Sequence, residues 1–192
     1  MFYKAIIIGA STGGPSALRT ILRSLPKSFP IPILVVQKIP QGIFAESLAE
    51  ALDEVSDITV RILKEKDVIN QHEVVLIPGG FNLIFEGDNN SIKLIPGEEP
   101  ENAPSISITI KQAISFFKGP IIFSVLTGIC LEDNLIDAAK NLSHHDGYIV
   151  TQKPDTCFID DLPQTVIQAN ISNDTIELDR MGPVLTELSG KV

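Results

Sequence analysis

The sequence predicts an α/β protein with a doubly wound, mostly parallel sheet, helices on both faces and a small antiparallel hairpin at one edge. Two observations predict this fold class. Short apolar runs, several rich in isoleucine or valine, alternate along the chain with longer segments that repeat apolar residues at helical spacing. A glycine-rich turn at residues 9–14 follows the first apolar run and leads directly into such a helical segment. Strand and helix units in this order form parallel sheets.

The apolar runs predict the strands, because they are too short for buried helices. The expected parallel strands are residues 4–9, 33–37, 59–63, 74–77, 121–126 and 148–152, with a weaker one at 176–178. Residues 82–85 and 92–95 flank Gly87-Asp88-Asn89-Asn90, which predicts the hairpin.

The helical segments show one apolar face each. Pro15 suits a first helical turn and Pro26 ends the run that it starts, while Phe44, Leu48 and Leu52 share a face of the next segment. The expected helices are residues 15–25, 44–52, 105–117, 133–142, 162–169 and 181–188.

Length and charge exclude several classes of protein. With 192 residues, of which 44% are hydrophobic, we expect one domain that spans residues 1–192. The net charge of -9 is unfavourable for a nucleic-acid partner. No apolar run approaches the roughly 18 residues of a membrane span, and two cysteines make no disulfide framework. We therefore expect a cytoplasmic protein without membrane insertion and without a metal or other cofactor.

The residues just after the strands are the candidates for chemistry, because ligands bind at the carboxyl edge of such sheets. Ser11, Lys38 and the loop 127–133 occupy these places. A serine in a glycine-rich turn could bind a phosphate, act as a nucleophile beside an oxyanion hole, or simply permit a tight turn. Dinucleotide binding is a remote alternative, because the fingerprint G-x-G-x-x-G has Ser11 at its second glycine and Lys38 stands where an acidic residue is expected.

Several motifs occur in the order and spacing of one known family. They are Gly9-Ala10-Ser11-Thr12-Gly13-Gly14-Pro15, Val36-Gln37-Lys38-Ile39-Pro40, Ile77-Pro78-Gly79-Gly80, Pro104-Ser105, Leu126-Thr127-Gly128 and Gln152. On these motifs the chain resembles the catalytic domain of chemotaxis receptor methylesterases, the CheB family, over nearly its whole length. The resemblance implies hydrolysis of glutamate methyl esters on chemoreceptors, and often deamidation of glutamine, by a Ser, His, Asp triad.

The resemblance places Ser11 at the nucleophile, and it also reveals departures at the other two triad positions. Lys38 stands at the histidine and Glu132 at the aspartate. Backbone N–H groups near Thr12 and Ile129 would be the oxyanion donors, although Ile129 itself replaces a methionine of the family motif. The site has therefore changed more than the fold.

Further departures surround this site. Asn82 replaces a histidine, Ser107 replaces an aspartate, and residues 161–163 differ from the Gly-Met-Pro of the family. The receiver domain that gates full-length relatives is not among these residues, so a separate receiver protein is a possible partner.

Replacing histidine by lysine is the severe change, because histidine titrates near pH 6.5 and lysine near about 10.4. A lysine base would need a depression of about three units, or roughly 4 kcal/mol. If Glu132 approaches Lys38, it stabilises the ammonium form instead.

We therefore expect a methylesterase-like domain of chemotaxis signalling that is inactive or much weakened. The alternatives are an active esterase that uses Ser11 with Lys38, and a non-catalytic module that binds a methylated chemoreceptor or similar partner. Whether the chain is an enzyme stays open at this point.

The remaining histidines and cysteines offer little chemistry. His72, His144 and His145 precede strands and should lie at the opposite edge of the sheet. Cys130 lies in the altered loop, either as a second candidate nucleophile or as a small apolar filler, and Cys157 has no evident role.

Overall fold

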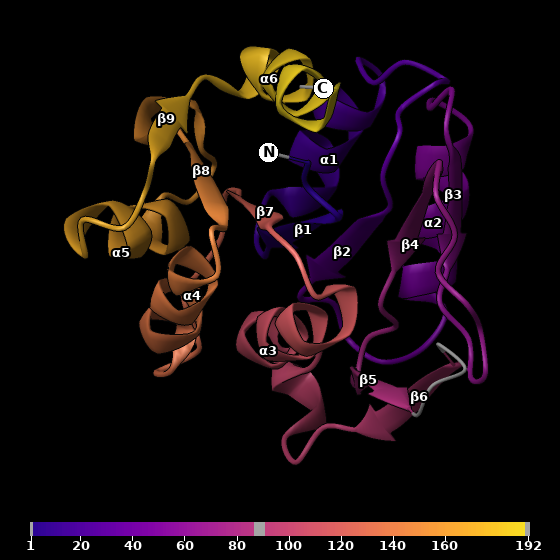
Figure 1. Ribbon diagram of the computed structural model, residues 1–192. Helices are drawn as coiled ribbons and strands as arrows, with labels where there is room; N and C mark the ends of the chain where they lie inside the picture. Colours follow the sequence, from indigo (N-terminus) through magenta and orange to yellow (C-terminus); the bar gives the residue numbers. More distant parts are fainter. Residues whose placement is uncertain (1, 87–90, 191–192) are drawn as a thin grey trace.

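The computed structural model describes residues 2–86 and 91–190. Within these residues, seven strands form one parallel sheet, in the order β3-β4-β2-β1-β7-β8-β9 (Figure 1). The strands of this sheet are β1 (Ala5–Ala10), β2 (Ile33–Gln37), β3 (Thr59–Ile62), β4 (Glu73–Leu76), β7 (Ile121–Val125), β8 (Tyr148–Gln152) and β9 (Asp174–Ile176). From β1 the chain passes to β2, then to the edge strand β3 and back to β4 between them, before it crosses to β7 on the other side of β1, so the direction of winding reverses between β1 and β7.

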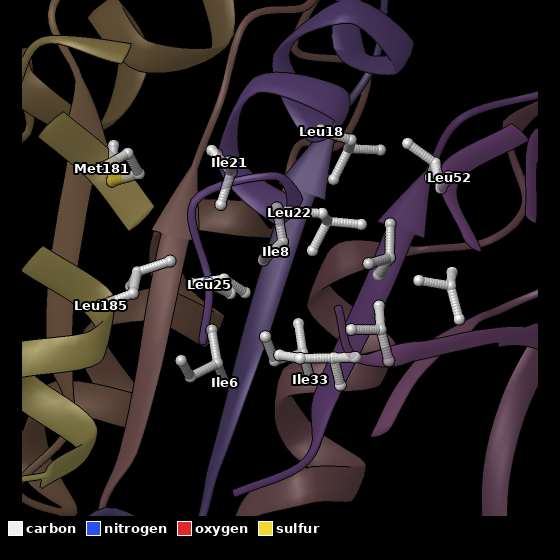
Figure 2. Close-up of a cluster of buried hydrophobic side chains, with 14 of the residues drawn as sticks. Ile6, Ile8, Leu18, Ile21, Leu22, Leu25, Ile33, Leu52, Met181 and Leu185 are labelled. Carbon is white, nitrogen blue, oxygen red and sulfur yellow. The ribbon is translucent and has the colours of Figure 1, made fainter. Parts of the chain in front are cut away.

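Helices cover both faces of the sheet, as the sequence predicts. They are α1 (Gly14–Leu22), α2 (Phe44–Asp53), α3 (Ile106–Phe117), α4 (Leu135–His144), α5 (Asp161–Gln168) and α6 (Leu178–Gly190). Alternate residues of β1 point into two separate cores. Ile6 and Ile8 pack with α1, α2 and α6 (Figure 2). Ala5 and Ile7 pack with α3, α4 and α5.

The predicted hairpin forms a separate two-stranded antiparallel sheet of β5 (Phe81–Glu86) and β6 (Ser91–Pro96). Its turn, residues 87–90, lies outside the described residues. The hairpin packs on α3, where the ring of Phe85 stacks on that of Phe116 with centroids 3.8 Å apart (Figure 1). This contact joins the hairpin to the helix whose N-terminus reaches the candidate site.

The sequence expectations differ from the structure mainly at element ends. The weak strand expected at 176–178 is β9, which ends at Ile176, and the final helix already begins at Leu178. Two short 3-10 helices, η1 (Pro100–Asn102) and η2 (Pro154–Thr156), were not expected, because three residues carry no periodic signal. Among the described residues, no helix combines the length and the apolar character needed to cross a bilayer.

Candidate functional site

The carboxyl ends of three neighbouring strands position the candidate residues. Ser11 directly follows β1, Lys38 directly follows β2, and the loop with Glu132 follows β7. Because β2, β1 and β7 are adjacent and parallel, these segments meet at one edge of the sheet. Ser11, Lys38 and Glu132 line one narrow space there, together with Ile129 and Cys130.

Ser11 is held through its backbone. Its N–H donates to the Thr127 carbonyl at 3.1 Å, and its own carbonyl accepts from Gly14 N at 2.8 Å and from Gln37 Nε2 at 2.9 Å. The turn into α1 uses Gly13 with φ 84°, a left-handed conformation that glycine adopts without strain. The residue is only 7% exposed. Among the described residues, the Ser11 hydroxyl has no hydrogen-bond partner.

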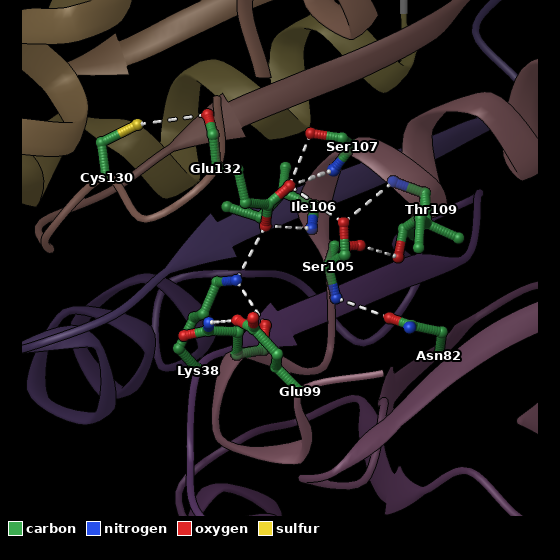
Figure 3. Close-up of polar contacts among 11 residues, drawn as sticks. Lys38, Asn82, Glu99, Ser105, Ile106, Ser107, Thr109, Cys130 and Glu132 are labelled. Atoms are coloured by element: carbon green, nitrogen blue, oxygen red, sulfur yellow. Dashed lines mark hydrogen bonds and ion pairs between the residues drawn. The ribbon is translucent and has the colours of Figure 1, made fainter. Parts of the chain in front are cut away.

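Lys38 and Glu132 form a buried ion pair. The Lys38 Nζ lies 2.9 Å from Glu132 Oε1, and the two side chains are 6% and 8% exposed (Figure 3). The same Nζ donates to the carbonyl oxygen of Asn102, in η1, at 2.6 Å. The Lys38 Nζ is therefore held between a carboxylate and a backbone carbonyl.

The N-terminus of α3 holds the other side of the Glu132 carboxylate. Oε1 accepts from the backbone N of Ile106 at 2.7 Å, while Oε2 accepts from the backbone N of Ser107 at 2.8 Å and from the Ser105 hydroxyl at 2.9 Å. The Ser107 hydroxyl is a further donor to Oε2. A carboxylate at the N-terminus of a helix is favoured by the helix dipole as well as by these donors.

These contacts lower the pKa of Glu132. Burial opposes them, since desolvation alone raises the pKa of a carboxyl group, but the charge of Lys38 and the hydrogen bonds from Ser107 and Lys38 outweigh it. Glu132 is therefore an ionised carboxylate at neutral pH.

Two amides fix the backbone around the site. Gln37 Nε2 bridges the carbonyls of Ser11 and Lys38, at 2.9 and 2.8 Å. Gln152 Oε1 accepts from Thr127 N at 2.9 Å, and its Nε2 donates to the Thr156 carbonyl at 2.8 Å. Strand ends from both sides of the switch point are thus linked to the Ser11 turn.

The other residues singled out from the sequence fall in two groups. Thr12 and Ile129 lie at the same edge as Ser11; the Thr12 carbonyl accepts from the Thr127 hydroxyl, and Ile129 is 43% exposed. Cys130 donates its backbone N–H to Asp161 at 2.8 Å. His72 directly precedes β4, with Nδ1 2.7 Å from the Phe29 carbonyl, so it lies at the amino edge of the sheet, opposite the Ser11 edge.

His144 ends α4 and His145 follows it, before β8 begins. They therefore lie at the amino edge, away from Ser11. In the part of the chain that the structure describes, no three His, Cys, Asp or Glu side chains gather in a way that could hold a metal ion.

Sequence reasoning missed part of the site. Asn102 contributes only a carbonyl oxygen, so no side-chain motif could reveal it. Ser105 and Ser107 were noted only as motif positions, yet both donate to Glu132. The available signal is a serine typical of a helix N-cap, followed by a second serine two residues later, because both hydroxyls can donate to a carboxylate at the N-terminus of the helix.

Two larger cavities flank the ion pair. One of about 360 Å³ is lined by Ser11, Lys38, Ile39, Pro40, Gln41, Pro100, Glu101 and Leu131. The other, of about 810 Å³, is lined by Lys38 and Glu132 together with residues of β6, the 97–105 segment and the 131–134 loop. Lys38 thus lines both cavities, although its side chain is only 6% exposed.

Comparisons with known proteins agree with this architecture. The family model of the CheB methylesterase matches residues 6–185. The chain is 32% identical over 186 residues to a protein-glutamate methylesterase/protein-glutamine glutaminase of Pseudomonas putida. The aligned region covers 96% of this chain and 49% of the relative. A namesake from Pseudomonas aeruginosa is 30% identical, with 96% and 50% covered. The chain spans about half the length of these curated relatives.

A solved structure is also similar. The crystal structure of the Thermotoga maritima CheB methylesterase catalytic domain superposes with a TM-score of 0.88 at 29% sequence identity, covering 98% of this chain and all of that one. The doubly wound, mostly parallel sheet and the small antiparallel hairpin predicted from the sequence are therefore confirmed, with the hairpin as a two-stranded sheet of its own.

Proposed function

The chain belongs to the CheB methylesterase family, and from this premise we propose that it binds the methylation sites of a chemoreceptor or similar signalling protein with little or no ester hydrolysis. In this proposal Ser11 holds the position of the nucleophile, Lys38 that of the base and Glu132 that of the orienting carboxylate. Backbone N–H groups near Thr12 and Ile129 are the oxyanion donors.

The observation that carries the proposal is the 2.9 Å ion pair between Lys38 and Glu132. A serine attacks an ester only when a neighbouring base takes its proton. An ammonium group has no lone pair to accept that proton. Since Glu132 and the Asn102 carbonyl engage the Lys38 Nζ, and no described residue forms a hydrogen bond with the Ser11 hydroxyl, we expect Ser11 to lack an efficient proton acceptor.

Binding of a receptor segment does not require a base beside Ser11, whereas ester hydrolysis does. The turn after β1, the 360 Å³ cavity and the surrounding loops remain formed around the ion pair. Several apolar side chains at this edge are exposed, among them Ile129, Leu131 and Phe158. These features support a protein that docks on a receptor without cleaving it.

A working esterase is the second candidate, because Ser11 and Lys38 line the same cavity. It would require Lys38 to lose its proton and leave Glu132. Loss of a triad base typically reduces kcat by about 10⁴-fold or more, so the two candidates differ by a large factor.

Methanol release from a methylated chemoreceptor tests the proposal. Wild type, Ser11→Ala and Lys38→His are compared, with the Thermotoga maritima catalytic domain as the positive control. We expect no release by the wild type above that of Ser11→Ala, together with measurable binding of the receptor. Release that disappears in Ser11→Ala would establish the esterase and overturn the proposal, and absence of receptor binding would also overturn it. Activity that arises in Lys38→His would show that only the base is missing.

A further inference from the structure

Only two of the three N–H groups of the Lys38 ammonium have an acceptor among the described residues. A lysine Nζ carries three protons, and two of them are used by Glu132 Oε1 and by the Asn102 carbonyl. No third acceptor for Nζ is found in residues 2–86 and 91–190. Because the side chain is only 6% exposed, an unused donor there costs free energy that a ligand oxygen would recover.

Glu132 does not compensate this charge by itself. Its two oxygens are shared with four donors from the start of α3, on Ser105, Ile106 and Ser107. One carboxylate thus faces both an ammonium and the positive end of a helix. The single negative charge of Glu132 thus faces two positive groups, so a second anion next to Lys38 would be favoured.

The cavity that Lys38 shares with Ser11 has the groups to receive such an anion. The Ser11 hydroxyl has no partner among the described residues, and it lines the same 360 Å³ space. A carboxylate presents two acceptor oxygens, so one can accept from Lys38 Nζ and the other from the Ser11 hydroxyl. A methyl ester is uncharged and offers only its carbonyl oxygen as a good acceptor.

We propose that this cavity binds the free γ-carboxylate of a glutamate in preference to its methyl ester, so that the domain reads the demethylated state of a methylation site. The inference rests on the proposed function and adds the state of the site that is recognised. Lys38 is the residue that determines this specificity, and Ser11 assists it as a hydrogen-bond donor.

The negative charge of Glu101 should weaken the binding of a carboxylate in this cavity. Its side chain lines the same cavity but is exposed, so water and salt screen its charge. Neutralising Glu101 should therefore strengthen carboxylate binding and leave ester binding unchanged.

The experiment is an NMR titration of the ¹⁵N-labelled protein with three small probes. They are N-acetyl-glutamate α-methylamide, the corresponding glutamine compound and the corresponding γ-methyl ester. The readouts are the Lys38 side-chain ammonium signal, where present, and the backbone amide signals of Ser11 and Leu131. The variants are Lys38→Gln, Glu101→Gln and, as a matched control, Lys27→Gln. Lys27 is exposed and precedes β2, so it lies at the opposite edge of the sheet.

We expect the carboxylate probe to bind about tenfold more tightly than the ester or the amide, the difference between a charge-assisted and a neutral hydrogen bond. Lys38→Gln should remove this preference, Glu101→Gln should raise carboxylate affinity about twofold or more, and Lys27→Gln should change neither. Equal or tighter ester binding, an unchanged preference in Lys38→Gln, or no saturable shift with any probe would overturn the inference. A methanol signal that grows in the ester titration would instead count against the proposed function, so the two failures are distinguishable.

Discussion

Gly128 lies directly against Ser11, because a Cβ atom at Gly128 would come within 2.5 Å of the Ser11 Cβ and 2.7 Å of its backbone nitrogen. The preceding carbonyl, that of Thr127, accepts the Ser11 N–H at 3.1 Å. The loop after β7 and the turn after β1 are therefore in close contact. Since the same loop carries Glu132, this contact couples the position of the carboxylate to that of the serine.

Gly128→Ala should destabilise the protein by about 1–3 kcal/mol, because the added methyl group meets backbone as well as side-chain atoms. Urea unfolding measures the effect. Gly190→Ala is the matched control, since a Cβ at Gly190 meets no atom within 4 Å and should change the free energy of unfolding by less than about 0.5 kcal/mol. A Gly128→Ala protein as stable as the control would contradict the close contact.

Removing both members of the buried ion pair should cost less than the sum of the costs of removing each one alone. Lys38→Gln and Glu132→Gln each leave an uncompensated buried charge, for which about 3–5 kcal/mol is typical. The double variant should be less destabilised than the sum of the two by about 1 kcal/mol or more. Urea unfolding of all four proteins gives this coupling energy, and additive effects would mean that the pair does not interact.

Glu132 should also make stability depend on pH in the acid range. Its pKa is lower in the folded protein than the ordinary value of 4.5, so the unfolded chain binds its proton first as the pH falls. The stabilisation from this group is fully present above about pH 4.5 and is lost as the pH drops toward the folded pKa. Free energies of unfolding at pH 7, 5 and 4 should fall less steeply in Glu132→Gln than in wild type, and parallel curves would refute this assignment.

Two serines of α3 should respond differently to the same substitution. Ser107 is fully buried and its hydroxyl donates a hydrogen bond to Glu132. Ser115 is exposed and its hydroxyl donates a hydrogen bond to the Lys111 carbonyl. Ser107→Ala should cost about 1.5–3 kcal/mol, as expected for a hydrogen bond to a charged group, and Ser115→Ala less than about 0.5 kcal/mol. Thermal or urea unfolding tests both, and equal costs would show that the contact with Glu132 is not stabilising.

The fold and the neighbourhood of the site could be predicted from the sequence, because the signals are local. Apolar runs and helical spacing identify strands and helices one at a time, and the alternation of the two requires a parallel sheet. In such a sheet every strand ends at the same edge, so Ser11, Lys38 and the loop with Glu132 could be placed along that edge. The adjacency of β2, β1 and β7, which brings them together, comes from the structure. Element ends were less predictable, as in β9 and α6, because short polar segments fit either structure.

Only the tertiary structure decided what Lys38 and Glu132 contact. The Asn102 carbonyl reaches Lys38 through a three-residue turn of 3-10 helix, and backbone carbonyls leave no mark in a sequence. The start of α3 reaches Glu132 because that helix packs against β1 and α4. The carboxylate and the carbonyl oxygen that contact the Lys38 Nζ come from segments more than sixty residues away in the chain, so the residues around Lys38 in the sequence do not reveal them.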